Sequence, residues 1–166
     1  MEQTVRELKE LTHSLTRDAL LQQLGPFVLV QRPFTPQPRA MARGVTAPLG
    51  KRPTASFDFE DLWILTLPPV RSRDAFTIGR GAECDVVVDE KTVSSVHAKI
   101  DWADLGPNHR AAMLFDMKSS NGTLLNGDKV SPDEPKLLRD NDAVDIGSVR
   151  LLYMTTDTFL KRIGRK

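Results

Sequence analysis

The chain has 166 residues and a formal net charge of +1, with 40% hydrophobic and 27% charged residues. These values are ordinary for a soluble globular protein. The length allows one domain with a core and an appendage, but it is tight for two full domains. The small net charge excludes a strong overall attraction to nucleic acid or to membranes. The single cysteine, Cys84, excludes an internal disulfide framework.

The N-terminus does not have the composition of a secretory signal. Residues 1–15 alternate charged residues with leucines and contain no apolar region of the kind that signal peptides have. No apolar run elsewhere approaches the roughly 18 residues that a membrane-spanning helix needs. We therefore expect a cytoplasmic protein.

Residues 4–24 have the pattern of an amphipathic helix. Thr4 and Glu7 stand three residues apart, as in a capping box, and Gly25-Pro26 is a stop signal. A short strand is predicted at Phe27 to Val30. The apolar stripe of the helix is formed by Leu8, Leu11, Leu15, Ala19 and Leu24. We expect the N-terminal unit, residues 1–30, to pack on the main domain or on another chain, so that oligomerisation through helix 4–24 is one possibility.

Residues 31–56 differ in composition from the rest of the chain. They contain five of the 11 prolines, and five basic residues but no acidic one. A Pro-rich, basic and weakly apolar stretch cannot bury enough surface to offset the entropy lost on ordering. This composition predicts a flexible Pro/Arg-rich linker, for which a solvated tether is favoured over contact with nucleic acid or lipid.

From residue 57 onwards the chain consists of short apolar runs separated by Gly, Pro, Asp or Asn. Each run is about four to six residues long, which is too short for an ordinary helix. Asn126-Gly127 is a typical two-residue hairpin turn. The runs lie at 62–67, 76–79, 85–88, 97–102, 111–116, 122–125, 143–147 and 149–154. This pattern predicts an all-β sandwich of short antiparallel strands over residues 57–155. Residues 156–166 are either a basic C-terminal tail or a short helix.

Three polar clusters fall in the predicted loops between these strands. The first is Gly79-Arg80-Gly81, the second is Ser94-Ser95-Val96-His97, and the third is Asp116 to Thr123, which contains Ser120-Asn121-Gly122. Cys84 to Val88, Asn126-Gly127 and Leu138 to Gly147 complete an ordered set of motifs. One such motif alone would be weak evidence, but several in this order are a specific signal.

In order and spacing, these clusters resemble the forkhead-associated (FHA) domain, over about residues 60–155. The resemblance is to a bacterial-type signalling protein with an N-terminal helical extension. It implies a β-sandwich whose strand-connecting loops hold a phosphothreonine peptide, with no chemistry carried out by the domain. The implied partners are a phosphothreonine-containing protein or peptide and a Ser/Thr kinase that acts upstream.

The residue types in the clusters suit a phosphate ligand. Arg80 offers a planar fork of donors that can hold two phosphate oxygens at once. The resemblance places the hydroxyls of Ser94 and Ser120 on the same phosphate. Asn121 carries both an amide donor and a carbonyl acceptor and can pair with the backbone of an extended peptide. Ser95 is also assigned to the phosphopeptide site, although it stands where many family members have arginine or lysine, so one cationic contact is missing.

Three further residues are expected to support the site. Gly79 and Gly122 permit backbone angles or close approaches that a side chain would block. The resemblance suggests that His97 braces the Ser94 loop by hydrogen bonding. Lys118 lies within the third cluster and is a candidate to compensate for the missing cation.

Catalysis and metal binding are not supported by these clusters. Ser94 and His97, with Asp85 or Asp116, could suggest a nucleophile and base, but spacing alone does not establish productive geometry and no nucleophile elbow is present. The three histidines and Cys84 lack metal-ligand spacing. We therefore expect no enzyme activity, no metal and no cofactor.

Three hypotheses for the whole chain remain open. The first is a signalling adaptor that captures a phosphothreonine peptide downstream of a Ser/Thr kinase. The second is an intramolecular switch, in which phosphorylation of Thr35, Thr46 or Thr54 in the linker closes the site at high effective concentration. The third is a structural interaction protein that binds its partners independently of phosphate.

Overall fold

The computed structural model describes residues 3–12, 15–25, 27–31, 62–66, 75–106 and 109–164. The strands are β1 (Gln3–Thr4), β2 (Phe27–Gln31), β3 (Trp63–Thr66), β4 (Ala75–Gly79), β5 (Val86–Val87), β6 (Ala98–Gly106), β7 (His109–Asp116), β8 (Thr123–Leu125), β9 (Asp128–Val130), β10 (Lys136–Leu138), β11 (Ala143–Ile146) and β12 (Val149–Thr155). The helices are α1 (Val5–Thr12), α2 (Arg17–Leu24) and α3 (Thr156–Arg162).

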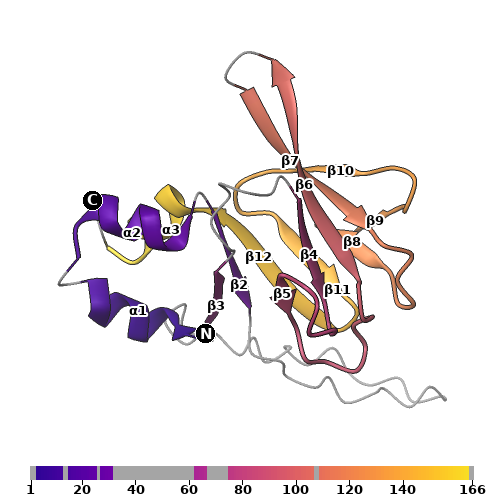
Figure 1. The fold of residues 1–166 in the computed structure, drawn as a ribbon, viewed down its shortest axis with the longest axis horizontal. Helices are drawn as coiled ribbons and strands as arrows, with labels where there is room; N and C mark the ends of the chain where they lie inside the picture. The colour runs from indigo at the N-terminus through magenta and orange to yellow at the C-terminus, as the bar shows by residue number, and fades with distance from the viewer. Residues whose placement is uncertain are drawn as a thin grey trace, which may run out of the picture.

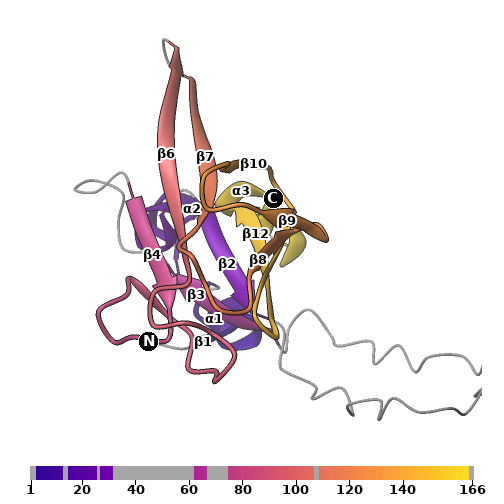
Figure 2. The same cartoon turned by 90° about the vertical axis from the view of Figure 1, so that its right-hand side faces the viewer.

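The strands form two sheets that face each other, which confirms the predicted β-sandwich (Figure 1). The first sheet has the order β1-β3-β2-β12-β11-β8-β9, and the second has the order β10-β7-β6-β4-β5. Among the strands that the structure describes, all pairings are antiparallel except that of β4 with β5. In Figure 2, the long β6–β7 hairpin projects beyond the rest of the sandwich.

The main core fills the space between the two sheets. Several of its strands alternate buried and more exposed residues, as in β11, where Val144 and Ile146 are buried and their neighbours are not. This alternation places every second side chain on the inner face. At one end of the core, the ring of Phe27 lies 5.0 Å from Trp102 and 5.1 Å from Tyr153, measured between centroids. Burial raises the pKa of the Tyr153 phenol.

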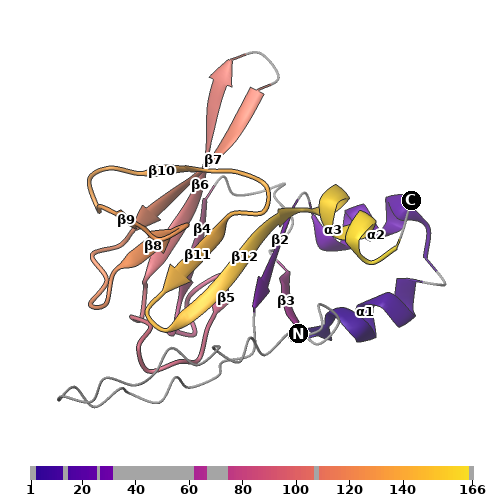
Figure 3. The ribbon, with the colours of Figure 1, turned by 180° about the vertical axis from the view of Figure 1, so that it is seen from behind.

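The three helices form a third layer on the outer face of the first sheet. Figure 3 shows α1, α2 and α3 gathered at one side, next to β2, β3 and β12. A second apolar core joins this layer to the sheet. Its buried members are Val5, Leu8, Leu20, Leu24, Val28, Val30, Leu62, Ile64, Met154, Phe159, Leu160 and Ile163. The N-terminal unit therefore packs on the main domain of its own chain.

The N-terminal segment contains two helices, so the prediction of one helix over 4–24 was wrong. Leu15 and Thr16 are not helical, and the Thr16 side chain caps α2 by accepting a hydrogen bond from the Ala19 N–H. The predicted capping box at the start of α1 is confirmed, because Thr4 N–H donates to Glu7 Oε2 and Glu7 N–H donates to Thr4 Oγ1.

Strand β2 lies in the middle of the first sheet and not at its edge. Its Gln31 is opposite Leu151 of β12 on one side and Trp63 of β3 on the other. The chain between β2 and β3, residues 32–61, lies outside the described residues. It holds most of the predicted linker and the three threonines of the switch hypothesis, Thr35, Thr46 and Thr54.

The predicted apolar runs and the predicted strand at Phe27 to Val30 all correspond to strands. Strands β1, β9 and β10 lie outside them, and each has only two or three residues. The Asn126-Gly127 turn is confirmed by positive φ angles of 52° and 93°, which a mirror-image hairpin turn requires at both positions. The C-terminal segment is not simply a basic tail, since Thr156–Arg162 forms α3.

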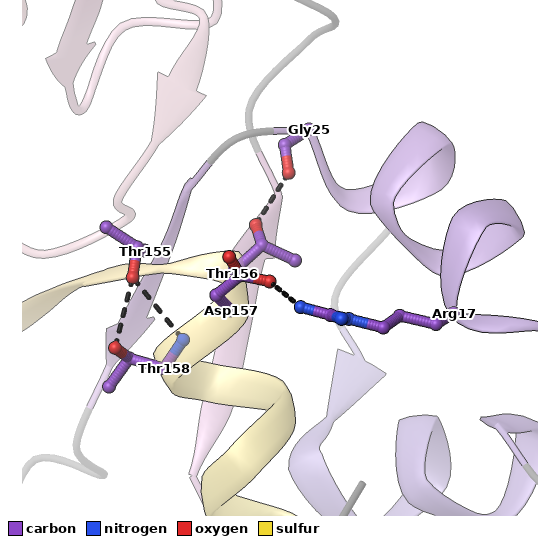
Figure 4. A network of polar contacts seen from close by, with 6 residues as sticks. All are labelled: Arg17, Gly25, Thr155, Thr156, Asp157 and Thr158. Carbon is purple, nitrogen blue, oxygen red and sulfur yellow. Dashed lines mark hydrogen bonds and ion pairs between the residues drawn. The ribbon is translucent and has the colours of Figure 1, made fainter. Parts of the chain in front are cut away.

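A small polar network ties α3 to α2 (Figure 4). The buried Thr156 hydroxyl donates to the Gly25 carbonyl at 2.6 Å, across 131 residues of sequence. Arg17 forms an ion pair with Asp157, and each of these side chains is 55% exposed. The Thr155 hydroxyl caps α3 by accepting from the Thr158 N–H. The two ends of the described chain are thus fixed to each other.

Among the described helices, none combines the length and the apolar character that crossing a membrane requires.

Candidate functional site

The three polar clusters lie at one end of the sandwich because neighbouring strands begin or end there. Strand β4 ends at Gly79, β6 begins at Ala98 and β7 ends at Asp116. Ala98 is opposite both Ile78 of β4 and Asp116 of β7. The loops that follow β4, precede β6 and follow β7 therefore leave the sheet side by side, at the end opposite the tip of the β6–β7 hairpin (Figure 1).

The Arg80 loop is fastened to the Ser94 loop through the backbone. Arg80 N–H donates to the Ser94 carbonyl at 2.9 Å, and the Arg80 side chain donates through Nε to the Val93 carbonyl at 3.3 Å. Arg80 is exposed, and its two Nη groups make no hydrogen bond to any described residue. The guanidinium is therefore held on one edge and available on the other.

Gly79 is required by the close approach of the Ser94 loop. A Cβ at this position would lie 2.2 Å from the Ser95 carbonyl oxygen and 2.9 Å from Cys84 Sγ. The Ser95 carbonyl also accepts hydrogen bonds from Gly81 N–H and from the Cys84 thiol. Burial, followed by the nearby charge of Glu83, raises the pKa of that thiol.

His97 is buried and links the Ser94 loop to the loop that follows β7. Its Nδ1 accepts from the Ser94 N–H at 3.0 Å, so the ring proton lies on Nε2, which donates to the Gly122 carbonyl at 3.0 Å. The His97 carbonyl accepts from Met117 N–H. Both ring nitrogens are thus bonded to backbone groups, and neither faces the Ser94 hydroxyl as a general base would. The alternative of a Ser94–His97 nucleophile is not supported by this geometry.

Asp116 organises the loop that follows β7. It is 6% exposed, and its carboxylate accepts from the hydroxyls of Ser119 and Thr123, each at 2.6 Å, and from Ser119 N–H. Burial acts to raise the pKa of Asp116, but the hydrogen bonds from Ser119 and Thr123 outweigh it, and the pKa lies below the ordinary value. The loop also contains Lys118 with a positive φ of 56°.

The sequence drew attention to Asp116 only as an orienting acid for a catalytic histidine. Its main contacts are instead two hydroxyls of its own loop. A signal for this was present, because an Asp followed by a Ser three residues later is a common arrangement for a side chain that caps a turn.

Ser120 and Asn121 are fixed to the Ser94 loop from the other side. Ser120 N–H donates to Ser94 Oγ at 3.1 Å, and Asn121 Nδ2 donates to the Thr92 carbonyl at 2.7 Å. Ser120 and Asn121 are exposed, and Ser94 is half-buried. Gly122, which follows them, has a φ of +79°, a conformation that favours glycine.

The predicted site residues are therefore gathered at one end of the sandwich, on three loops that are hydrogen-bonded to one another. Ser95 and Lys118 are exposed. The hydrogen bonds from Gly81 N–H and from the Cys84 thiol go to the backbone carbonyl of Ser95 and not to its side chain. Among the described residues, no group of His, Cys, Asp or Glu has the arrangement of a metal site.

Comparison with known proteins identifies this part of the chain. The family model of the FHA domain matches residues 76–147. The probable serine/threonine-protein kinase fhkA of Dictyostelium discoideum is 31% identical over 81 residues, which are 47% of this chain and 14% of that kinase. The ABC transporter ATP-binding/permease protein Rv1747 of Mycobacterium tuberculosis is 36% identical over 87 residues, which are 52% of this chain and 9% of the transporter.

A third relative is the DNA damage response protein kinase DUN1 of Saccharomyces cerevisiae, 29% identical over 80 residues, which are 47% of this chain and 15% of that kinase. The chain thus spans only a small part of each of these relatives. Among solved structures, the yeast Dun1 FHA domain, in complex with a doubly phosphorylated peptide derived from Rad53, superposes with a TM-score of 0.53. The identity is 21%, and the match covers 79% of this chain and 74% of that one. At this identity the likeness concerns the fold.

Proposed function

Residues 76–147 form an FHA domain, and we propose from this premise that the chain binds phosphothreonine peptides as a signalling adaptor. The observation that carries the proposal is the joining of three loops at one end of the sandwich. Arg80 N–H bonds to the Ser94 carbonyl, and Ser120 N–H bonds to the Ser94 hydroxyl oxygen. The three side chains assigned to the phosphate therefore stand on loops whose relative positions are set before any ligand binds.

A phosphothreonine presents about two negative charges and three strong acceptor oxygens. Arg80 contributes the fixed positive charge, and the bond from its Nε to the Val93 carbonyl leaves the four Nη hydrogens for phosphate. Ser94 Oγ accepts one hydrogen bond from Ser120 N–H, so its own hydroxyl hydrogen remains to be donated. Ser120 contributes a second hydroxyl from the opposite loop.

Asn121 is assigned to the backbone of the peptide. One of its amide hydrogens is used by the Thr92 carbonyl, which leaves the other hydrogen and the carbonyl oxygen for an extended peptide. A preference for threonine over serine would require a dry niche for the extra methyl group, worth about 0.8 kcal/mol from burial alone.

The free energy of peptide binding can be estimated from the number of hydrogen bonds to the phosphate. Charge-assisted hydrogen bonds contribute about 1.5–3 kcal/mol each, and ordering the peptide opposes them. Three or four such bonds support a dissociation constant on the order of 1 μM, which corresponds to about −8 kcal/mol. Because Ser95 supplies no cation, the affinity rests mainly on Arg80, and Lys118 is the nearest candidate for a second charge.

The proposal also includes the proteins with which the chain would act. A Ser/Thr kinase is the class of enzyme that creates the phosphothreonine, and two relatives of this domain, fhkA and DUN1, are themselves named as kinases. In this chain the domain acts as a binding module without catalysis, and we place it in the cytoplasm. The relatives come from an amoeba, a yeast and a bacterium, so they do not restrict the chain to a bacterial type.

The switch hypothesis is the second candidate, and one observation favours it. Gln31 and Trp63, the last residue of β2 and the first of β3, are paired with each other, and Gln31 is opposite Leu151. Leu151 is only three residues from Ser148, whose hydroxyl lies 2.6 Å from that of Thr92 in the Ser94 loop. The segment that carries Thr35, Thr46 and Thr54 therefore begins and ends near the proposed site.

The third hypothesis, a phosphate-independent interaction protein, would be favoured by oligomerisation through the N-terminal helices, and this possibility has less support. Leu8, Leu20 and Leu24 are buried in the core that the helices share with their own sheet. These side chains are already covered within one chain, so they do not form the apolar surface that a partner would need.

A binding screen against a phosphothreonine-oriented peptide library tests the proposal. We expect selection of phosphorylated over unphosphorylated peptides by the wild type and loss of selection by Arg80→Ala. Retained selection by Arg80→Ala would show that the assigned site is wrong. For the switch, the chain is phosphorylated in the linker, verified by mass spectrometry, and titrated again, and undiminished peptide binding would exclude it.

A further inference from the structure

The orientation of Asn121 depends on a carbonyl that lies outside the three predicted clusters. Asn121 Nδ2 donates to the Thr92 carbonyl at 2.7 Å. A carbonyl can only accept a hydrogen bond, so this contact also fixes which end of the side-chain amide faces Thr92. The other end, the carbonyl oxygen, is thereby turned away from Thr92.

Thr92 is itself held by the turn between β11 and β12. Its Oγ1 accepts from Ser148 N–H at 2.9 Å and lies 2.6 Å from Ser148 Oγ, across 56 residues of sequence. Two contacts from one residue, one to the backbone and one to the hydroxyl, restrict both the rotation of the Thr92 side chain and the position of the turn.

The turn approaches Thr92 too closely for any residue but glycine at position 147. A Cβ on Gly147 would lie 2.4 Å from the Thr92 carbonyl oxygen and 2.7 Å from its Oγ1, and φ at this residue is +58°. Gly147 N–H also contacts the Gly122 carbonyl at 3.5 Å, the same carbonyl that accepts from His97. The turn therefore touches both loops that carry Ser94 and Asn121.

We propose that Thr92 and Ser148 are positioning residues for Asn121, and that they set the affinity for the peptide backbone without contacting the phosphate. The chain of contacts runs from Ser148 through the Thr92 hydroxyl and carbonyl to the Asn121 amide. All of these groups are uncharged, so the effect is geometric. The inference rests on the proposed function, since it assigns Asn121 to the bound peptide.

The test uses the full chain with two substitutions at Thr92. Thr92→Val keeps the β-branched shape but removes the hydroxyl, whereas Thr92→Ser keeps the hydroxyl. For a phosphothreonine peptide selected by the library, Thr92→Val should weaken binding about three- to ten-fold, the effect of one lost hydrogen bond. Ser148→Ala should also weaken binding, whereas Thr92→Ser should bind the peptide with an affinity close to that of the wild type.

A double-mutant cycle separates positioning from a general structural role. If Thr92 acts through Asn121, Thr92→Val should have no further effect on affinity when Asn121→Ala is already present. Equal loss in both backgrounds, or unchanged affinity in Thr92→Val, would overturn the proposal. Thr158→Val is the matched control, because it disrupts another hydroxyl pair, Thr155 with Thr158, beside α3, and it should leave affinity unchanged.

A second readout works without any peptide. The side-chain amide resonances of Asn121 in a ¹H–¹⁵N spectrum should shift in Thr92→Val and Ser148→Ala but not in Thr158→Val. If the wild type bound no phosphopeptide, the proposed function would fail, and the spectrum would still test the positioning of Asn121. Unshifted Asn121 resonances in Thr92→Val would refute the positioning itself.

Discussion

The Arg80 side chain makes one contact within the protein and offers a second to the phosphate. The shape of the guanidinium is therefore needed at this position, in addition to its positive charge. Its Nε is bonded to the Val93 carbonyl, which holds the guanidinium against the Ser94 loop, while both Nη groups face no described partner. A lysine would keep the positive charge but would lose both the bond to Val93 and the two-pronged contact with phosphate.

We therefore expect Arg80→Lys to weaken phosphothreonine-peptide binding by about ten-fold or more, the loss of one charge-assisted hydrogen bond. The measurement is a calorimetric titration of each variant with the same peptide. Arg139→Ala, which removes another exposed arginine, is the control and should bind as the wild type does. Full affinity in Arg80→Lys would show that the fork geometry is not used.

Asp116 makes the stability of the site loop dependent on pH. Its hydrogen bonds hold its pKa below the ordinary value of 3.8. A carboxyl group whose pKa is lower in the folded than in the unfolded chain stabilises the fold above its unfolded pKa, and this contribution disappears as the pH falls through the folded pKa.

Asp116→Asn should thus cost about 1–3 kcal/mol in the free energy of unfolding near neutral pH. The difference from the wild type should begin to shrink below about pH 4, where the carboxyl group of the unfolded chain takes up a proton, and should disappear once the pH is below the lowered pKa of the folded state. Urea denaturation at several pH values measures this, with the exposed Asp133→Asn as control. A difference that stays constant from pH 7 to pH 2 would contradict the role given to the carboxylate.

At the scale of single residues, some features could be predicted from the sequence and others could not. That Arg80, Ser94, Ser120 and Asn121 lie in loops between strands could be predicted, because they stand in short local motifs between apolar runs. The contact of Thr92 with Ser148 was not, since it joins residues 56 positions apart and neither side chain is unusual for a turn. Only the three-dimensional path of the chain brings these two hydroxyls together.

At the level of elements, the strands followed from their short apolar runs, and the helices were harder to delimit. The break between α1 and α2 was missed because the leucine spacing continues across it. The signal that interrupts the helix is Thr16, an N-cap residue followed by the acidic Asp18. Helix α3 has the same marks, with Thr155 as cap and Asp157 in its first turn, and it also has Lys161 and Arg162 in its last turn.

Two polar contacts between α2 and α3, one buried and one exposed, can be compared by mutation. Thr156→Val would leave the Gly25 carbonyl without its buried donor and should destabilise the fold by about 1–2 kcal/mol. Arg17→Ala removes an ion pair whose side chains are more than half exposed, and it should cost less than about 1 kcal/mol. Thermal or urea denaturation compares the two, and neither variant should change phosphopeptide affinity. A larger loss of stability in Arg17→Ala than in Thr156→Val would contradict this ranking of the two contacts.

The molecule as a whole is a sandwich with a third layer of helices on one face. Its least predictable feature was the place of Phe27–Gln31, because nothing in a four-residue apolar run such as Phe27 to Val30 tells which distant strands it will join. It lies between β12 and β3, so the N-terminal residues complete the sheet that continues to the β11–β12 turn. The helices then cover apolar side chains of that same sheet.

Since the helices share a core with the sheet, they should unfold together with it. Leu20→Ala, at a side chain with 0% exposure, should lower the free energy of unfolding by about 2–5 kcal/mol. The exposed Gln22→Ala on the same helix should have little effect. Far-ultraviolet circular dichroism and tryptophan fluorescence should give one coincident transition in both variants. A separate, earlier loss of helical signal would show that the helices are an independent unit.

The most direct test of the central claim is a calorimetric titration of the wild-type chain with one peptide in two forms. The forms are identical except that the threonine is phosphorylated in one and unmodified in the other. We expect binding on the order of 1 μM for the phosphorylated form and no measurable binding for the other. Equal affinity for the two forms would contradict the claim that this domain reads phosphothreonine.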